Sequence, residues 1–243
     1  MIIDAHCHAG TFTGFISGTH PPDELIVAYD RANVELGMIS ILDSHNMSGA
    51  NDITRQACEA HKGRLLGYIY INPSNVKAAL AELDRCAKFD CFRGVKLHPM
   101  NDVYFPFFEG YYPVYEKIEK LGLPTLWHSG TSPYSHPLQI AYVARQFPTI
   151  PFILGHFGLS DLTWECFPAA DLAHNIYVDT TANPIIPVLN DWIERFGAER
   201  MLWGSDFPFY DVAYELRKVD HLGCRQAQKE LIGRENARRI FRL

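Results

Sequence analysis

Short apolar runs alternate with longer amphipathic stretches along the whole chain. Eight runs of five to seven residues are rich in aliphatic, β-branched or aromatic side chains and are bounded by polar, glycine or proline positions. Runs of this length and composition favour β-strands over helices. The predicted strands are Ile2–His6, Met38–Leu42, Leu65–Ile71, Cys91–Leu97, Leu123–His128, Pro151–His156, Asn175–Asp179 and Arg200–Gly204.

The stretches between these runs carry helix signals. Ser74 is a plausible N-cap for a helix whose apolar stripe runs from Val76 to Ala87. Pro113 suits a first helical position, and Gly122 lies where a helix would end. Two further helices are predicted to begin near Pro137 and Val212.

Strands that alternate with helices predict parallel βαβ units. Eight such units in 243 residues favour a single (β/α)8 TIM barrel over residues 1–243, with eight parallel strands inside an outer ring of helices. A barrel of this kind builds its active site from the carboxyl ends of the strands and the loops that follow them. Candidate catalytic residues should therefore lie at those ends.

The first predicted strand ends in a His-x-His motif. Strict alternation predicts that Asp4, His6 and His8 share one face of the strand and that Cys7 lies on the other as a small buried filler. Two imidazoles in alternate positions can bind one metal ion, although so short a motif needs further ligands to be convincing. The other ionisable residues at predicted strand ends are Lys96, His98, His128, His156, Asp179 and Asp206.

These strand-end motifs, together with the opening Ile3–His8 and the closing Gly233–Phe241, resemble the amidohydrolase superfamily. The nearest group is the amidohydrolase-related one, which contains hydrolases, lactonases and decarboxylases of the aminocarboxymuconate-semialdehyde and resorcylate types. The resemblance implies that the metal is bound by His6, His8, His128 and Asp206, and that His156 is the catalytic histidine.

Three imidazoles and a carboxylate suit one divalent metal ion. Zn²⁺ is favoured, with Mn²⁺, Co²⁺ or Fe²⁺ as alternatives. A bound metal lowers the pKa of water, so Asp206 could accept a proton as that water attacks a carbonyl, and His156 could polarise the carbonyl or protonate the leaving group.

Three other candidates have more than one interpretation. Lys96 and His98 are predicted to bind a substrate carboxylate; alternatively, a carboxylated Lys96 would bridge a second metal ion. Asp4 is predicted to have a structural hydrogen-bonding role, whereas a structural and a catalytic role fit Asp179 equally well.

The preferred function is metal-dependent hydrolysis of a small amide, lactone or related carbonyl compound. Non-oxidative decarboxylation of a small carboxylate at the same site is the alternative. The related decarboxylases place an arginine in an early loop, and here no arginine precedes Arg31, which argues against decarboxylation. A barrel that binds a small molecule without turnover is the third hypothesis.

A small-molecule substrate is the expected partner, and the composition argues against nucleic acid without identifying any partner. The net charge of −6 and pI of about 6.0 argue against a nucleic-acid binder. Six scattered cysteines, with neither a signal peptide nor a membrane-spanning run, predict a cytoplasmic protein. The resemblance suggests a homodimer. The aromatic segment 99–112 is predicted to be either a lid over the site or an apolar cover or subunit contact.

Overall fold

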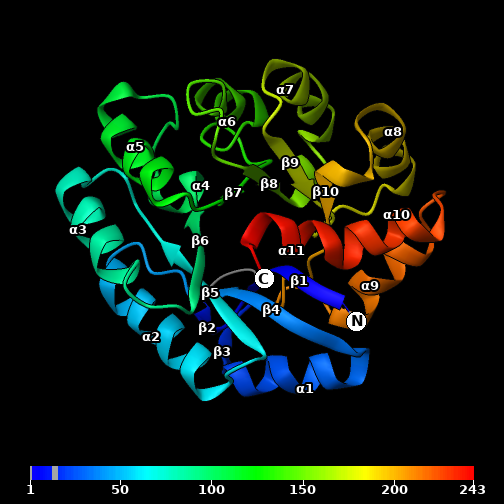
Figure 1. The fold of residues 1–243 in the computed structure, drawn as a ribbon, viewed down its shortest axis with the longest axis horizontal. Coiled ribbons are helices and arrows are strands. Elements are labelled where there is room, and N and C mark those ends of the chain that lie inside the picture. The colour runs from blue at the N-terminus through cyan, green and yellow to red at the C-terminus, as the bar shows by residue number, and fades with distance from the viewer. Residues whose placement is uncertain (1, 13–15) are drawn as a thin grey trace.

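The computed structural model describes residues 2–12 and 16–243, and eight of its strands form one sheet in which hydrogen-bonded neighbours are parallel (Figure 1). The predicted eight-stranded TIM barrel is confirmed. A separate antiparallel hairpin of β2 (Gly10–Phe12) and β3 (Gly18–His20) follows the first strand. The strands of the main sheet, in order, are β1 (Ile2–His8), β4 (Val34–Ser40), β5 (Leu65–Tyr70), β6 (Phe92–Leu97), β7 (Thr125–His128), β8 (Phe152–Gly155), β9 (Ile176–Asp179) and β10 (Met201–Leu202).

Backbone hydrogen bonds between the first and last strands bring the sheet round into a barrel. The N–H of Ala5 donates to the carbonyl of Trp203 over 3.0 Å, and the N–H of Asp206 donates to the carbonyl of His6 over 2.8 Å. The chain therefore places the motifs of β1 and β10 side by side.

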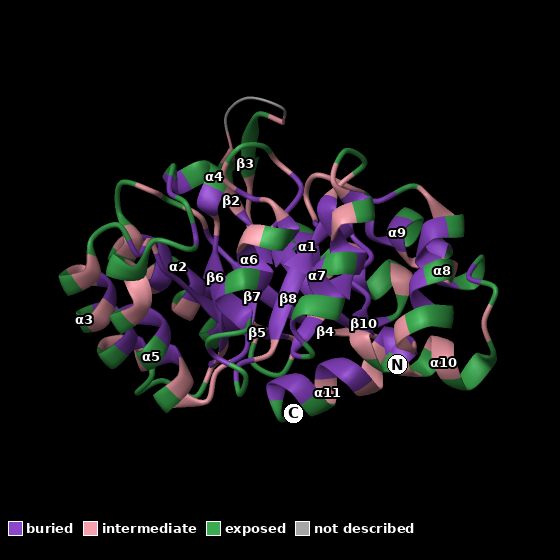
Figure 2. Cartoon of the chain, turned by 90° about the horizontal axis from the view of Figure 1, so that it is seen from above, coloured by how far each residue is buried: buried purple, intermediate pink, exposed green. Residues whose placement is uncertain are grey.

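Helices surround the strands, with their exposed sides outward and the strands buried at the centre (Figure 2). None of the helices within the described residues combines the length and apolar character needed to cross a bilayer. The α-helices are α1 (Pro22–Ala32), α2 (Met47–Ala60), α3 (Val76–Cys86), α4 (Pro99–Asp102), α5 (Tyr112–Leu121), α6 (Pro137–Ala144), α7 (Cys166–Leu172), α8 (Ile186–Phe196), α9 (Val212–Asp220), α10 (Gln226–Glu230) and α11 (Asn236–Phe241). Short 3-10 helices are η1 (Glu109–Tyr111), η2 (His156–Gly158), η3 (Thr163–Glu165) and η4 (Ala198–Arg200), and η5 (Leu231–Glu235) is a π-helix.

A bulge in β1 corrects the predicted alternation. Asp4 pairs with Gly37 and Cys7 pairs with Ile39, so β1 advances by three residues where β4 advances by two. The prediction that Asp4 lies on the same face as His6 and His8 is therefore wrong.

The carboxylate of Asp4 instead accepts a hydrogen bond of 2.9 Å from the hydroxyl of Tyr29, on the surrounding helix α1. It also accepts bonds of 3.0 Å from the backbone N–H groups of His6 and Ser205, so it ties β1 to the loop after β10. This agrees with the structural role predicted for Asp4.

The predicted helix ends are close to those observed. Gly122 ends α5 with a left-handed φ of 64°, as predicted. The N-cap of α3 is Asn75 and not Ser74, because the Asn75 side chain accepts a hydrogen bond of 3.2 Å from the N–H of Ala78. The second strand of the barrel begins earlier than predicted, at Val34.

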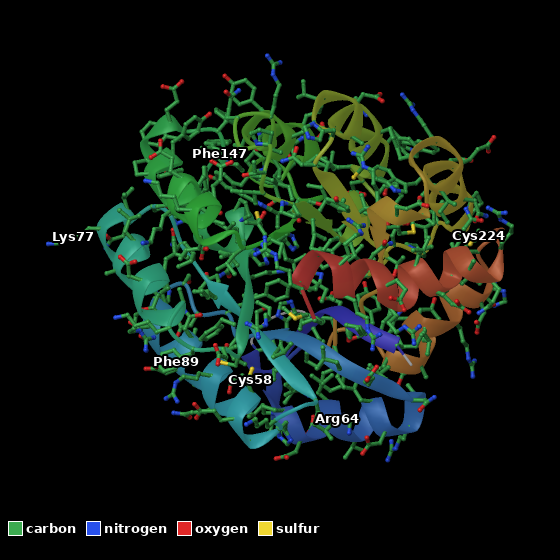
Figure 3. All side chains as sticks on the ribbon, in the orientation of Figure 1. Cys58, Arg64, Lys77, Phe89, Phe147 and Cys224 are labelled. Carbon is green, nitrogen blue, oxygen red and sulfur yellow. The ribbon has the colours of Figure 1, made fainter. Side chains whose placement is uncertain are left out.

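The amino end of the barrel is closed by α11, which lies across it in Figures 1 and 2. Side chains fill the space inside the ring of strands (Figure 3). At the closed end, the ring of Phe241 packs edge-on against Tyr68, with centroids 5.7 Å apart. These two rings join a buried cluster with Ile3, Ala5, Met38, Leu126, Ile153, Leu202, Ala237 and Ile240. The candidate site is therefore expected at the opposite end of the barrel, where the strands have their carboxyl ends.

Replacing Phe241 with alanine is expected to lower the free energy of unfolding by about 3–5 kcal/mol, because it leaves a cavity in this cluster. Urea denaturation of the two proteins measures the difference. Phe108→Ala is the matched control, since Phe108 is 58% exposed and its loss should change stability by about 0.5 kcal/mol or less. A Phe241→Ala variant as stable as this control would contradict the packing described.

Candidate active site

The predicted site residues meet at the carboxyl end of the barrel. His6 and His8 lie on β1 and His128 ends β7. His98 and His156 directly follow β6 and β8, and Asp206 lies in the loop after the short β10. All of these residues except the fully buried His6 line a pocket of about 240 Å³. The pocket is lined by His8, Leu42, His98, His128, His156, Leu159, Ala182, Asp206, Phe209 and Tyr210.

Three donor atoms converge where the two histidines of β1 meet Asp206. His6 Nε2 lies 3.2 Å from His8 Nε2, and Asp206 Oδ1 lies 3.8 Å from the first and 3.6 Å from the second. Ligands bound about 2.0–2.1 Å from a tetrahedral ion lie roughly 3.3–3.4 Å from one another. The spacing and the chemistry of these donors therefore fit one divalent metal ion.

His156 lies beside this cluster. Its Nδ1 is 3.8 Å from Asp206 Oδ2, and it groups with His6 and Asp206 as side chains able to hold a metal ion together. His128 is connected to His156, since its Nδ1 lies 3.0 Å from His156 Nε2, and its Nε2 lies 2.9 Å from Thr131 Oγ1. His98 stacks on His128 with ring centroids 4.0 Å apart. The structure thus brings all the predicted histidines together.

Burial keeps these imidazoles neutral. It lowers the pKa of His6 well below the usual histidine value, and the nearby Lys96 ammonium lowers it further. Burial and the Lys96 ammonium also lower the pKa of His8 to about 3 and the pKa of His128 to about 3. Burial acts in the opposite direction on Asp206 and raises its pKa. Neutral imidazole is the form that binds metal ions.

Lys96 lies beneath the pocket and does not line it. The side chain is fully buried, and its Nζ is 2.9 Å from His6 Nε2. Burial lowers the pKa of Lys96 to about 8. Of the two predicted substrate-binding residues, His98 therefore lines the pocket, whereas Lys96 contacts His6, a candidate metal ligand.

Asp179 has a more central position than the sequence indicated. Its Oδ2 lies 2.8 Å from His6 Nδ1, and its Oδ1 accepts a 2.8 Å hydrogen bond from the backbone N–H of His156. Thr181, which the sequence analysis did not single out, donates from Oγ1 to Asp179 over 2.6 Å and lies 2.9 Å from His156 Nδ1. A threonine two residues after a strand-end aspartate carries no distinctive signal in a single sequence.

Asp179→Asn is expected to weaken Mn²⁺ binding about 10- to 100-fold, because the carboxylate orients His6 and keeps its ring proton on Nδ1, so that the lone pair for the ion lies on Nε2. Isothermal titration with Mn²⁺ measures the change. Asp161→Asn serves as the control, since Asp161 is exposed. Unchanged Mn²⁺ affinity in Asp179→Asn would show that this contact does not orient His6.

Several residues around the pocket have left-handed backbone conformations that are uncommon outside glycine. The φ angles are 67° at His156, 58° at Ala182 and 54° at Asp206. Such conformations cost on the order of 1–3 kcal/mol each and persist where surrounding contacts enforce them. They aim these side chains and loops in ways that strand alternation does not predict.

The aromatic segment 99–112 begins with α4, whose N-cap is His98. No residue of this segment is among the described residues that line the pocket. Phe105, Phe107 and Phe108 are 41–58% exposed. Phe105 packs against Tyr134, with ring centroids 4.9 Å apart. The two predicted roles of this segment, a lid or a cover, both stay predictions.

Residues 3–243 match the family model described as Amidohydrolase. The chain belongs to the amidohydrolase family. The resemblance seen in the strand-end motifs is thus confirmed over nearly the whole amidohydrolase chain.

The chain is similar in sequence to decarboxylases and similar in fold to decarboxylases and a probable hydrolase. Gamma-resorcylate decarboxylase of a Rhizobium species is 24% identical to this amidohydrolase over 245 residues, covering 80% of this chain and 75% of the relative. The structure of a dihydroxybenzoic acid decarboxylase from a Polaromonas species, with bound manganese and the inhibitor 2-nitroresorcinol, gives a TM-score of 0.81 at 18% identity and covers 100% of this chain and 97% of its own. The structure of a probable 2-pyrone-4,6-dicarboxylic acid hydrolase from Acinetobacter baumannii, with citric acid bound, gives a TM-score of 0.79 at 14% identity. The match covers 100% of this chain and 99% of the hydrolase chain. At such identities these structures establish the shared barrel fold.

Proposed function

We propose that this amidohydrolase is a metal-dependent, non-oxidative decarboxylase of a small aromatic carboxylate. The proposal reverses the preference for hydrolysis reached from sequence, which is not confirmed. The decarboxylase named among the curated relatives aligns with 80% of the chain, and it supports the alternative that the sequence analysis kept second.

One observation carries the proposal: a metal-donor cluster adjoins a small pocket whose other lining is largely apolar. Besides the imidazoles and Asp206, the lining consists of Leu42, Leu159, Ala182, Phe209 and Tyr210. A pocket of about 240 Å³ admits a single ring with small substituents, and it is below the usual size of sites for larger ligands.

An apolar wall favours loss of CO₂. A carboxylate loses its charge as the carbon–carbon bond breaks, so a poorly solvating wall disfavours the starting carboxylate more than the transition state. Within the described lining there is neither arginine nor lysine. The early-loop arginine of the related decarboxylases thus has no counterpart in this lining. The substrate carboxylate would have to bind to the metal-donor cluster and the neighbouring imidazoles.

The metal ion would be held by His6, His8, His128 and Asp206 in this proposal, and it would supply a Lewis acid for the anionic oxygens of the substrate. Mn²⁺ is the ion named in the Polaromonas structure, and Zn²⁺ has no such support. A second ion, expected only if Lys96 is carboxylated, stays a prediction.

In the proposed reaction, side chains of the protein deliver one proton to the substrate. As CO₂ leaves, the electron pair of the broken bond stays on the ring carbon and takes up a proton. His156 and Asp206 line the pocket with Nδ1 and Oδ2 3.8 Å apart, and we assign the delivery of this proton to them. His98, stacked on His128, would contact the substrate ring from the β6 side.

The test uses Mn²⁺-loaded protein and gamma-resorcylate in D₂O. Decarboxylation is expected to release equal amounts of CO₂ and of a dihydroxybenzene that carries one new carbon-bound deuterium at the vacated position. Mass spectrometry and NMR of the product measure this, with protein-free buffer as the control for exchange.

Other outcomes identify the rival functions. Absence of CO₂ with gamma-resorcylate and with other hydroxybenzoates, combined with ring opening of a lactone such as 2-pyrone-4,6-dicarboxylate, would replace the proposal with hydrolysis. Tight binding of these compounds without any product would favour the third hypothesis, a barrel that binds without turnover.

A further inference from the structure

Helix α9 carries a buried ion pair to which the proposed chemistry gives no role. Glu215 and Lys218 are only 1% and 7% exposed, and the Lys218 ammonium lies 2.5 Å from the Glu215 carboxylate. Buried charges are costly, and removing one partner of such a pair leaves the other uncompensated. A pair in this position therefore calls for a function beyond filling space.

The pair holds the loop that follows β9. Lys218 Nζ donates to the backbone carbonyl of Thr180 over 2.6 Å and to that of Asn183 over 3.2 Å. The backbone N–H of Ala182, between these two residues, donates to the Glu215 carboxylate. Three backbone groups in one short loop are thus fixed by two side chains of a single helix.

The same loop reaches the reactive end of the barrel. Ala182 lines the pocket in its left-handed conformation, and Thr181 lies 2.9 Å from His156 Nδ1 through its hydroxyl. Asn183 donates from Nδ2 to the carbonyls of Phe157 and Leu159, over 3.3 and 3.1 Å, in the loop that carries His156. The loop therefore contacts both the pocket and the catalytic histidine.

We propose that the Glu215–Lys218 pair is a positioning device that fixes residues 180–183 and, through Thr181 and Asn183, the orientation of His156. The two residues act at a distance from the substrate and are positioning residues. The effect on turnover rests on the proposed function, whereas the effect on the loop does not. A strained loop needs such constraints, because Ala182 and His156 would otherwise relax to commoner backbone conformations.

The experiment compares Mn²⁺-loaded wild-type protein with Lys218→Met and with the double variant Glu215→Gln/Lys218→Met. Arg217→Met is the matched control, since Arg217 is the neighbouring cation on the same helix and is exposed. Hydrogen–deuterium exchange follows residues 156–159 and 180–183, Mn²⁺ titration gives the metal affinity, and kcat and KM are measured with gamma-resorcylate.

In Lys218→Met, amide exchange in both segments is expected to accelerate about tenfold or more. We expect kcat to fall about 10- to 100-fold through misplacement of His156, while Mn²⁺ affinity stays within about twofold. The double variant removes the uncompensated charge, so it should regain thermal stability without regaining kcat. It also replaces Lys218→Met as the test protein if that variant does not fold.

Two results would overturn the proposal. One is exchange in residues 156–159 and 180–183 that matches the Arg217→Met control. The other is a double variant with wild-type kcat, which would show that the pair serves folding alone. If wild-type protein releases CO₂ neither from gamma-resorcylate nor from other hydroxybenzoates, the decarboxylase assignment fails, and the exchange result alone decides the positioning proposal.

Discussion

Asp206→Asn is expected to lower kcat/KM for gamma-resorcylate about 10³-fold or more in Mn²⁺-loaded protein. Asp206 is the residue with two proposed tasks, because Oδ1 lies 3.6 Å from His8 Nε2 in the donor cluster and Oδ2 faces His156. Asparagine keeps the shape of the side chain but loses its charge and its ability to exchange a proton. Steady-state assays at saturating Mn²⁺ measure the loss.

Asp211→Asn is the matched control for this substitution. Asp211 is an exposed N-cap of α9, and asparagine caps helices as well as aspartate does, so activity and stability should both be retained. An Asp206→Asn variant with activity close to that of the control would remove Asp206 from the site.

His156→Asn is expected to lower kcat about 10²- to 10⁴-fold, the usual contribution of a positioned proton carrier. Asparagine is chosen because it tolerates the left-handed φ of 67° found at this position better than most residues. We expect the variant to keep its bound Mn²⁺, because the ligand set we propose uses His128 and not His156. Metal analysis after gel filtration, beside kcat measurement, tests both parts.

His174→Asn is the control, since His174 is exposed and precedes β9, at the amino end of the barrel. Loss of Mn²⁺ from His156→Asn, in proportion to the loss of activity, would contradict the catalytic assignment and would make His156 a metal ligand. The proximity of His156 Nδ1 to Asp206, at 3.8 Å, makes this an incisive comparison.

Strand positions and candidate site residues could be predicted from sequence because the barrel fold links the two. Each apolar run had to end at the same face, so residues such as His128 and Asp206 could be placed together before any contact was known. The β1 motif shows the limit of this reasoning. Alternation placed Asp4 with His6, whereas the bulge of β1 turned Asp4 towards Tyr29. A bulge arises from pairing with β4, which the sequence of β1 alone does not encode.

The supporting contacts around the histidines were also beyond sequence reasoning. Lys96, which is predicted to bind substrate, has its Nζ 2.9 Å from His6 Nε2, a contact that the sequence did not indicate. Thr181 and Lys218 gave no signal, because their roles depend on loop conformations such as the left-handed Ala182. Hydrogen bonds between residues far apart in the chain determine these conformations, and local patterns carry no information about them.

The preference between hydrolysis and decarboxylation was likewise not determined by the ligand motif. The same imidazoles and carboxylate suit both reactions, and the argument from a missing arginine concerned one loop residue only. The apolar wall formed by Leu159, Ala182 and Phe209 comes from three separate loops, so it became visible only in the folded chain.

Anomalous diffraction from crystals of Mn²⁺-loaded protein tests the central claim most directly. The account predicts one manganese peak at the carboxyl end of the barrel, in contact with His6 Nε2, His8 Nε2 and Asp206 Oδ1, whose donor atoms already lie 3.2–3.8 Å apart. A peak at any other place, or Mn²⁺ binding that survives replacement of both His6 and His8 by alanine, would contradict it.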